Sequence, residues 1–304
     1  MSRLQIQLFI LLLIPILGLT YTNCSKVDFQ NNDPASLQGL GAEDVLPEDD
    51  DNGNTDPGNT GGGGGSGSVA VICDPFGSST SSEAGIVAKL VYYDGANASR
   101  EIKTTVDMFT KGTRIEDTVV LFNTINVPTR EFDEGFEVAP GEKLKNSRGE
   151  TLFEYFGLEY NANLKLAAED QEGDYQLGVI SDDGSVVWVN SGSGLMEMVK
   201  NDRITSTRME CGGTIKLKKG DRLPMRMRYF QGPKLKIAVN LLWRRVTPGM
   251  QMSPSYCGTA EEFFVTDEGE SDAKFQRAMR DGWKIIPAAN FERNIMVQNT
   301  CPSK

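Results

Sequence analysis

The chain has 304 residues, of which 39% are hydrophobic and 24% are charged, and its formal net charge is −11. This length is enough for one or two domains with a real core. The absence of histidine excludes Ser-His-Asp and Cys-His catalysis, together with every zinc site that needs imidazole. The acidic balance argues against nucleic-acid binding, because contact with phosphates needs a basic surface. Composition therefore favours a soluble, β-rich protein with a low-complexity insert.

Residues 1–24 have the pattern of an export signal. Arg3 precedes the apolar run "LFILLLIPILGL", which has the length of a signal core and is too short for a comfortable membrane span. The "TYTNCS" that follows resembles, in part, the lipobox of bacterial lipoproteins, with Cys24 at the modified position. We predict lipidation at Cys24 and, because Ser25 follows, anchoring in the outer membrane. The alternative is an ordinary cleaved secretory signal.

Residues 25–68 are predicted to be a disordered tether. The stretch "DVLPEDDDNGNTDPGNTGGGGGSGS" is acidic and then glycine-rich. Such a composition buries too little apolar area to offset the loss of chain entropy on folding. A flexible tether after a membrane-proximal cysteine would hold the following domain away from the membrane surface.

Five cysteines are present, and none lies in a CxxC motif. If Cys24 carries lipid, four remain, which suits two disulfides in an oxidising compartment. Four cysteines permit three pairings, and the sequence does not choose among them. We favour Cys257–Cys301, which would close the C-terminal segment on itself, and this choice leaves Cys73–Cys211.

Period-2 alternation dominates residues 69–247 and predicts antiparallel β-strands. The apolar residues expected to face the core include Tyr175, Leu177 and Val179; Met225, Met227 and Tyr229; and Leu235, Ile237, Val239, Leu241 and Trp243. Half-polar strands separated by Gly/Asp turns are typical of an antiparallel sandwich or barrel rather than of βαβ units. The predicted fold class is therefore all-β.

A C-terminal extension, residues 248–304, is predicted to hold one helix. The stretch "ESDAKFQRAMRDGW" begins with Ser271 or Asp272 as a cap, and Phe275 and Met279 stand four residues apart in it. Gly282 supplies the stop signal. We expect a small helix packed beside the β-domain.

From about Gly85 to Arg245 the chain resembles a PA14 domain, a β-barrel module found in glycosidases, yeast flocculins and bacterial surface proteins. The resemblance depends on several motifs in the right order: "GIVAKLVYYDG", "GDYQLGVISDDGSVVWVN" and "IKLKKGDRLPMRMRYFQGPKLKIAVNLLW". A departure occurs at "WVNSGSG", where the family often has Asp-Gly after the strand. The resemblance implies an antiparallel PA14-like sandwich or barrel and a binding function.

The adjacent carboxylates Asp182 and Asp183 are the candidate ligand or metal site. Successive side chains on a regular strand point to opposite faces, so the two converge only if the backbone bends or the peptide bond is cis. In flocculins, the resemblance implies such a cis-linked pair that holds calcium, which in turn bridges sugar hydroxyls. Gln231 occupies the position of a further amide ligand, and Asn190 could add an oxygen. The alternative is a tight turn in which the aspartates cap backbone amides.

We predict no enzymatic activity. Glycoside hydrolysis needs two carboxyl groups roughly 5–10 Å apart across the scissile bond, and neighbours at one turn do not provide this. Trp188, Trp243 and Trp283 could stack on sugars, but large aromatic side chains in strands more often belong to the core.

The predicted function is that of an exported cell-envelope lipoprotein whose domain binds a glycan or an envelope protein, with calcium as a candidate cofactor. Its predicted partners are this ligand and, through the N-terminal lipid, a membrane. Nucleic acid is excluded. The alternative is a structural or assembly module that contacts proteins and has no small ligand.

Overall fold

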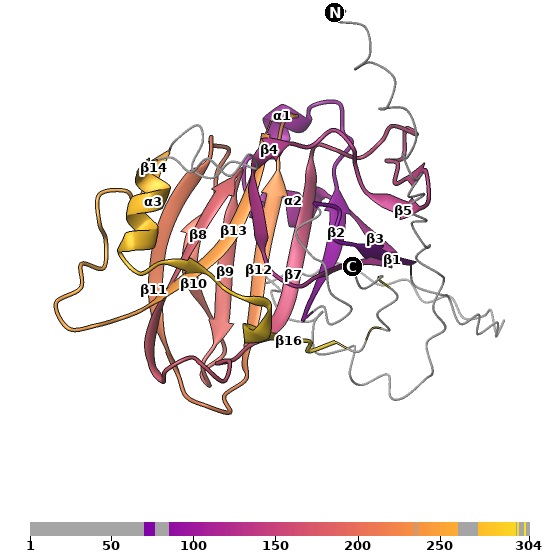
Figure 1. The fold of residues 1–304 in the computed structure, drawn as a ribbon. Helices are drawn as coiled ribbons and strands as arrows, with labels where there is room; N and C mark the ends of the chain where they lie inside the picture. The colour runs from indigo at the N-terminus through magenta and orange to yellow at the C-terminus, as the bar shows by residue number, and fades with distance from the viewer. Residues whose placement is uncertain are drawn as a thin grey trace, which may run out of the picture.

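The computed structural model describes residues 70–76, 85–234, 236–260, 273–295, 297 and 301 (Figure 1). The predicted signal, the lipidation site Cys24 and the tether lie outside the described residues. Within the described part, no helix has the length and apolar character needed to cross a membrane.

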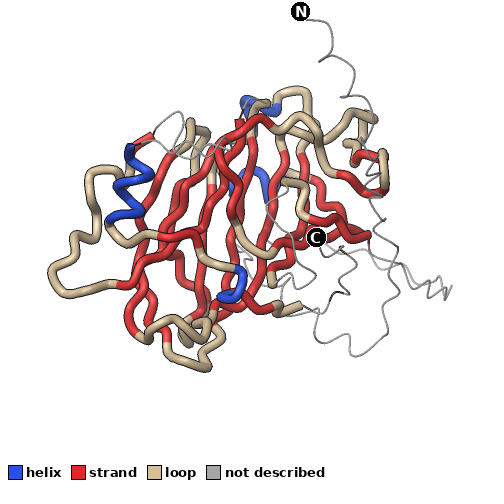
Figure 2. The backbone as a smooth tube through the Cα atoms, viewed as in Figure 1, coloured by secondary structure: helices blue, strands red, loops and turns tan. Residues whose placement is uncertain are grey.

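Two β-sheets make up most of the structure (Figure 2). The first sheet has the order β1-β3-β2-β7-β12-β9-β10, with β16 also paired to β7. Its strands are β1 (Ala70–Cys73), β2 (Ile86–Tyr92), β3 (Thr113–Phe122), β7 (Phe156–Leu164), β9 (Ser185–Asn190), β10 (Leu195–Asn201), β12 (Leu223–Gln231) and β16 (Phe291–Glu292).

The second sheet has the order β14-β11-β8-β13-β15, with β4 also paired to β13. Its strands are β4 (Asn126–Glu131), β8 (Gly173–Asp182), β11 (Arg208–Leu217), β13 (Lys236–Arg245), β14 (Thr259–Ala260) and β15 (Lys284–Ile285). A separate pair consists of β5 (Glu137–Ala139) and β6 (Glu142–Lys143). All described pairs are antiparallel except β1 with β3. The predicted all-β, mainly antiparallel class is confirmed.

The main core lies between the two sheets, and the predicted alternation accounts for it. The apolar residues expected to face inward on β8, β12 and β13 all belong to this one buried cluster. Leu235, expected with them, lies outside the described residues. Their neighbours Arg226 and Arg228 on β12 point to the opposite face, as a strand requires. Trp243 is fully buried in the core, which confirms the structural interpretation for that residue.

Within the residues that the structure describes, the helices are α1 (Ala98–Glu101), α2 (Thr105–Lys111), α3 (Ala273–Arg280) and the 3-10 helix η3 (Ala288–Asn290). The predicted C-terminal helix is confirmed as α3. Gly282 lies just beyond its end with a positive φ of 89°, and its N–H donates to the carbonyl of Met279. The predicted caps Ser271 and Asp272 lie outside the described residues.

The C-terminal segment, from residue 248 onward, contacts both sheets. Its strands β14 and β15 pair with β11 and β13 in the second sheet, and β16 pairs with β7 in the first. Trp283 and Ala278 pack in a small buried cluster with Ile180, Met209 and Leu242, which lie on the outer face of the second sheet. Val297 packs against Val71, Val87 and Leu121 on the outer face of the first.

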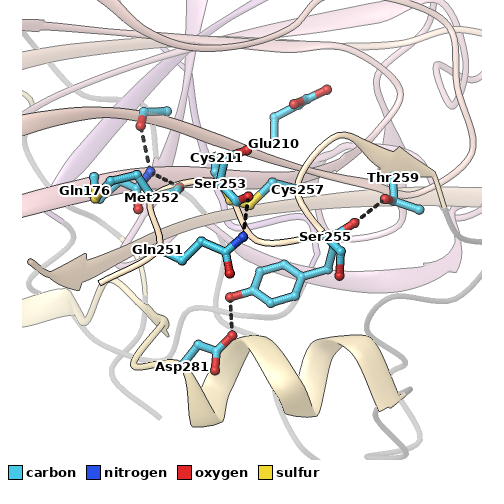
Figure 3. The surroundings of a disulfide bond; sticks show 12 residues. Gln176, Glu210, Cys211, Gln251, Met252, Ser253, Ser255, Cys257, Thr259 and Asp281 are labelled. Carbon is cyan, nitrogen blue, oxygen red and sulfur yellow. Dashed lines mark hydrogen bonds between the residues drawn. A yellow bond between two sulfur atoms is a disulfide. The ribbon is translucent and has the colours of Figure 1, made fainter. Parts of the chain in front are cut away.

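The predicted disulfide pairing is wrong, although the predicted number of disulfides agrees with the described structure. Cys73 joins Cys301, with a Cα–Cα distance of 5.6 Å. Cys211 on β11 joins Cys257, with a Cα–Cα distance of 5.4 Å (Figure 3). The segment is not closed on itself by Cys257–Cys301, because its two ends are attached to different sheets. Cys73–Cys211 is excluded because each of these cysteines is bonded to another partner.

Candidate functional site

One end of the sandwich gathers three connections, which together we call the aspartate rim. They are the β8–β9 turn at 182–185, the β10–β11 connection at 202–207 and the β12–β13 connection, described at 232–234. The register explains their proximity, because Ala238 near the start of β13 pairs with Asp182 at the end of β8. Tyr229 near the end of β12 likewise pairs with Ser185 at the start of β9.

Asp182 and Asp183 form the centre of the aspartate rim, and the peptide bond between them is cis. The Asp182 carboxylate accepts a hydrogen bond from the Thr207 hydroxyl at 3.3 Å. Asp183 is 4% exposed. Its Oδ1 accepts from the Thr205 N–H at 2.9 Å, and its Oδ2 accepts from the Gly232 N–H at 2.8 Å. Asp183 thus fastens the other two connections to the β8–β9 turn.

Gly184 allows this turn to sit against the end of β12. A Cβ atom at this position would lie 2.3 Å from Cε1 of Phe230, so no other residue fits without displacing the ring. Beneath the turn, the buried hydroxyls of Ser181 and Ser185 are 2.8 Å apart, and the Asn201 amide donates to the Ser181 oxygen. The Asp-Asp-Gly sequence therefore reflects packing as well as turn formation.

Burial raises the pKa of both aspartates, so both are weaker acids than an exposed aspartate. Desolvation, followed by the charge of Asp183, raises the pKa of Asp182 to about 7. Desolvation also raises the pKa of Asp183 to about 6, although the N–H donors of Thr205 and Gly232 act to lower it. Near neutral pH the pair therefore holds more protons than two exposed aspartates would, and a nearby cation would favour release of those protons.

Gln231 lies beside the pair, as predicted, but its amide is used within the protein. The Tyr229 hydroxyl donates to the Gln231 Oε1, and it also lies 2.6 Å from the main-chain oxygen of Asp182. The Gln231 Nε2 donates to the carbonyls of Pro233 and Lys236. This 1% exposed side chain braces the β12–β13 connection from inside.

Asn190 is not brought to the aspartate rim. It ends β9, whereas Asp183 lies two residues before that strand begins, and seven residues of extended chain span roughly 20 Å. Its Oδ1 accepts from the N–H groups of Gly192 and Gly194. Asn190 therefore builds the β9–β10 turn at the opposite end of the sheet, which corrects its place among the candidate ligands.

Thr205 and Thr207 were not singled out from the sequence, and Tyr229 was predicted as a core residue and not as a neighbour of the aspartates. Their contacts with the aspartates span 22 to 47 residues, and no local pattern in the sequence marks them. Ile204 is a further residue of the aspartate rim that the sequence did not mark. Its side chain is 36% exposed, and its Cδ1 would lie 3.7 Å from a Cβ placed on Gly232. The aspartate rim thus has an apolar neighbour beside its carboxylates.

The oxygen donors at the aspartate rim are of the type that calcium prefers. Calcium takes six to eight oxygen ligands, including carboxylates and carbonyls. In the described part of the chain, no group of three or more His, Cys, Asp or Glu residues could hold a metal. Carboxylates are a ligand type that calcium takes, so Asp182 and Asp183 are the candidate ligands here, and main-chain carbonyls, water or sugar hydroxyls would have to complete the set.

No family model and no curated protein matches this chain. Among solved structures it is similar to a PA14 sugar-binding domain from an RTX adhesin, at 15% identity over 53% of this chain and 90% of that one, with a TM-score of 0.38. It is similar to the PA14 domain of the MpAFP antifreeze protein, at 14% identity over 64% of this chain and 95% of that one, also with a TM-score of 0.38.

The Candida glabrata Epithelial Adhesin 6 A domain, in complex with Galb1-3GlcNAc, is 14% identical over 68% of this chain and 95% of that one, with a TM-score of 0.37. PA14 domains are thus among the solved structures to which the chain is similar, as the sequence resemblance predicts. At these identities and TM-scores the likeness says nothing of a ligand, so the function is inferred from the geometry of the aspartate rim.

Proposed function

We propose that this chain is a cell-envelope lipoprotein whose β-sandwich binds a glycan at the aspartate rim, through calcium held by Asp182 and Asp183. The observation that supports the proposal is the enclosure of two adjacent carboxylates in one corner, with raised pKa values. Burying carboxylates without a compensating charge is costly. A divalent cation would offset that cost and hold both side chains ionised.

Five residues of the aspartate rim have a part in this function. Asp182 and Asp183 would bind the ion, and the bound ion would supply open coordination positions for sugar hydroxyls. The hydrogen bonds from Thr205 and Gly232 keep the Asp183 carboxylate in place before the ion arrives. Ile204 would contact the apolar face of a sugar ring, because it is exposed beside the carboxylates.

Calcium should raise the melting temperature of the protein in a concentration-dependent way. A ligand that binds only the folded state at 100 times its dissociation constant stabilises it by about 2.7 kcal/mol. Asp182→Asn together with Asp183→Asn should abolish that rise and any glycan binding. Thermal melts in chelator and in increasing calcium, followed by a glycan array in both conditions, measure these effects.

The control for this experiment is Asp133→Asn together with Glu134→Gln, which removes two exposed charges from a loop. It should keep the full calcium response. Each variant is compared with its own melt in chelator, because asparagine at 183 can accept fewer hydrogen bonds than the carboxylate does. A wild-type melt unchanged by calcium contradicts the calcium site, and an array silent in both conditions contradicts glycan binding.

Calcium affinity should rise steeply between pH 5 and pH 8. The ion needs both carboxylates deprotonated, and their pKa values are about 7 and about 6. Two protons must therefore leave at pH 5 and almost none at pH 8, which weakens apparent affinity at pH 5 by roughly a thousandfold. Calorimetric titration at several pH values, in buffers of different ionisation enthalpy, measures both the affinity and the protons released.

The same pKa values determine how the two aspartates make the stability of the calcium-free protein depend on pH. Because both are raised above the unfolded value, their stabilising contribution is full below about pH 4 and is lost as pH rises through 6 and 7. In chelator, wild-type stability relative to the double asparagine variant should therefore fall across that range. A difference that does not change with pH would show that the two carboxyl groups titrate normally.

A second candidate function is a protein-interaction module with no small ligand. It is favoured by the hydrogen bonds of Asp183, whose two oxygens each accept from a main-chain N–H of a different connection. Such bonding is sufficient reason for an aspartate at this turn. Under this alternative, calcium leaves the melt unchanged, and the array shows no glycan.

Membrane attachment through Cys24 is part of the proposal. Cys24→Ser should remove the lipid mass, and the exported protein should become soluble, because the lipid on Cys24 is the anchor in this proposal. Mass spectrometry and membrane fractionation of the two forms measure this. A variant that stays in the membrane would show that the apolar run at 8–19 is an uncleaved anchor.

A further inference from the structure

The outer face of the first sheet, on the side opposite the core, carries a cluster of polar and aromatic side chains. We call it the arginine face, and it consists of Lys89, Glu159, Asn161, Trp188, Arg226 and Arg228. Each of these residues lies between two core residues on its strand, so its side chain points away from the core. The cluster spans β2, β7, β12 and β9, which are adjacent in the sheet.

Strand register places the members of the arginine face in two rows. Lys89 on β2 is opposite Glu159 on β7, which is opposite Arg228 on β12. In the next row, Asn161 on β7 is opposite Arg226 on β12, which is in turn opposite Trp188 on β9. Directly opposite side chains in a sheet lie within contact distance of one another.

The two arginines have different surroundings. Arg228 pairs with Glu159 at 2.7 Å, and its guanidinium lies 4.8 Å from the ring centre of Phe109 and 5.8 Å from that of Trp188. Arg226 makes no hydrogen bond or ion pair with any described residue, and its Nε is buried. Buried donors without an acceptor are rare in folded proteins, and each one needs an explanation.

Charge on this face is positive although the chain as a whole is acidic. The rows continue onto β10, where Glu197 is opposite Trp188 and Lys200 is opposite Val186. With these two residues, which pair with each other at 3.5 Å, the face holds four cationic side chains, Lys89, Arg226, Arg228 and Lys200, and two carboxylates, Glu159 and Glu197, whereas the full chain has a net charge of −11. A guanidinium without a partner suits a carboxylate or sulfate, which it can bind through two parallel hydrogen bonds. Trp188 beside it is half-buried and offers a ring on which the apolar face of a sugar can stack.

We propose that the arginine face is a second binding site, which takes an anionic sugar. Arg226 binds the acidic group, Trp188 stacks on the ring, and the ion pair of Arg228 with Glu159 holds Arg228 in place beside Trp188. This site is independent of calcium and of the aspartate rim. The acidic group can be a carboxylate or a sulfate, because both accept the same pair of hydrogen bonds.

Tryptophan fluorescence provides a reporter for this site. Trp243 and Trp283 are 0% and 2% exposed, so a change in emission on adding a sugar arises from Trp188. The probes are trigalacturonate, its neutral methyl ester and a sulfated trisaccharide, each titrated into the full chain in chelator at low salt. Chelator prevents calcium binding at the aspartate rim, so failure here and failure of the proposed function are distinguishable.

We expect trigalacturonate or the sulfated probe to change the emission and to bind at least tenfold more tightly than the ester. Arg226→Gln should reduce the affinity for the acidic probe at least tenfold, to the level of the ester. Arg226→Lys should recover only part of that affinity, because lysine keeps the charge but lacks the pair of parallel N–H donors of a guanidinium. Asp182→Asn with Asp183→Asn should leave the affinity unchanged.

Lys216→Ala is the matched control, because it removes one exposed positive charge from β11 in the other sheet. It should bind as the wild type does. Thermal melts of every variant establish that it is folded. Equal binding of acid and ester, absence of binding by both anionic probes at millimolar concentration, or full binding by folded Arg226→Gln would each overturn the proposal.

Discussion

Replacing Cys73 and Cys301 together by serine should lower the free energy of unfolding by about 5 kcal/mol. This disulfide joins residues that are 228 positions apart, so it limits the unfolded chain more than a short loop would. In the chain-entropy model the stabilisation grows with the logarithm of loop length. Chemical denaturation of the oxidised protein and of the double serine variant, monitored by circular dichroism, measures the difference.

The second disulfide supplies the matched comparison. Cys211 and Cys257 are 46 positions apart, and their replacement by serine should cost about 4 kcal/mol in the same model. Non-reducing peptide mapping should recover these two pairs. Recovery of Cys257 joined to Cys301, or a smaller loss for the pair with the longer loop, would contradict this account.

Trp283→Ala should destabilise the protein by about 4 kcal/mol, which is the range for removing a buried aromatic side chain. Trp283 is 2% exposed and packs on the outer face of the second sheet with Ile180 and Leu242. The Arg244 guanidinium lies 4.7 Å from the centre of its ring. The substitution therefore removes the contact that covers this face.

Met252→Ala is the control for Trp283→Ala. Met252 is also in the C-terminal segment, but it is 37% exposed. It contacts Gln176 through its main-chain oxygen (Figure 3), which alanine retains. Its substitution should change stability by about 0.5 kcal/mol or less. If both variants melt alike, the C-terminal segment does not stabilise the sandwich.

The sequence was sufficient to predict the strands and the helix, because both depend on local periodicity. Met225, Met227 and Tyr229 alternate with arginines, and that pattern alone places them in the core. The pairing of the cysteines could not be predicted in this way. It depends on the path of the C-terminal segment across both sheets, and no local pattern encodes that path.

The sequence predicted the two aspartates of the candidate site but not the residues that contact them. Asp182 and Asp183 are consecutive, and the Asp-Asp-Gly pattern between two strand-like runs marks their turn without any knowledge of the sheets. Asn190 is close in sequence, but the extended β9 carries it to the other end of the sheet. Thr205 and Gly232 are 22 and 49 residues from Asp183 in the sequence, and it is the pairing of the sheets that brings them to it.

The Cys73–Cys301 bond also determines how the domain responds to a pulling force. A load applied between residue 70 and the C-terminus enters at β1 and passes through this bond, so the 228-residue loop that it closes is not extended. Once the bond is reduced, the same load can draw out roughly 800 Å of chain, at 3.3–3.6 Å per residue. For a protein tethered at its N-terminus, the oxidised domain would therefore transmit tension to the tether with little change in its own length.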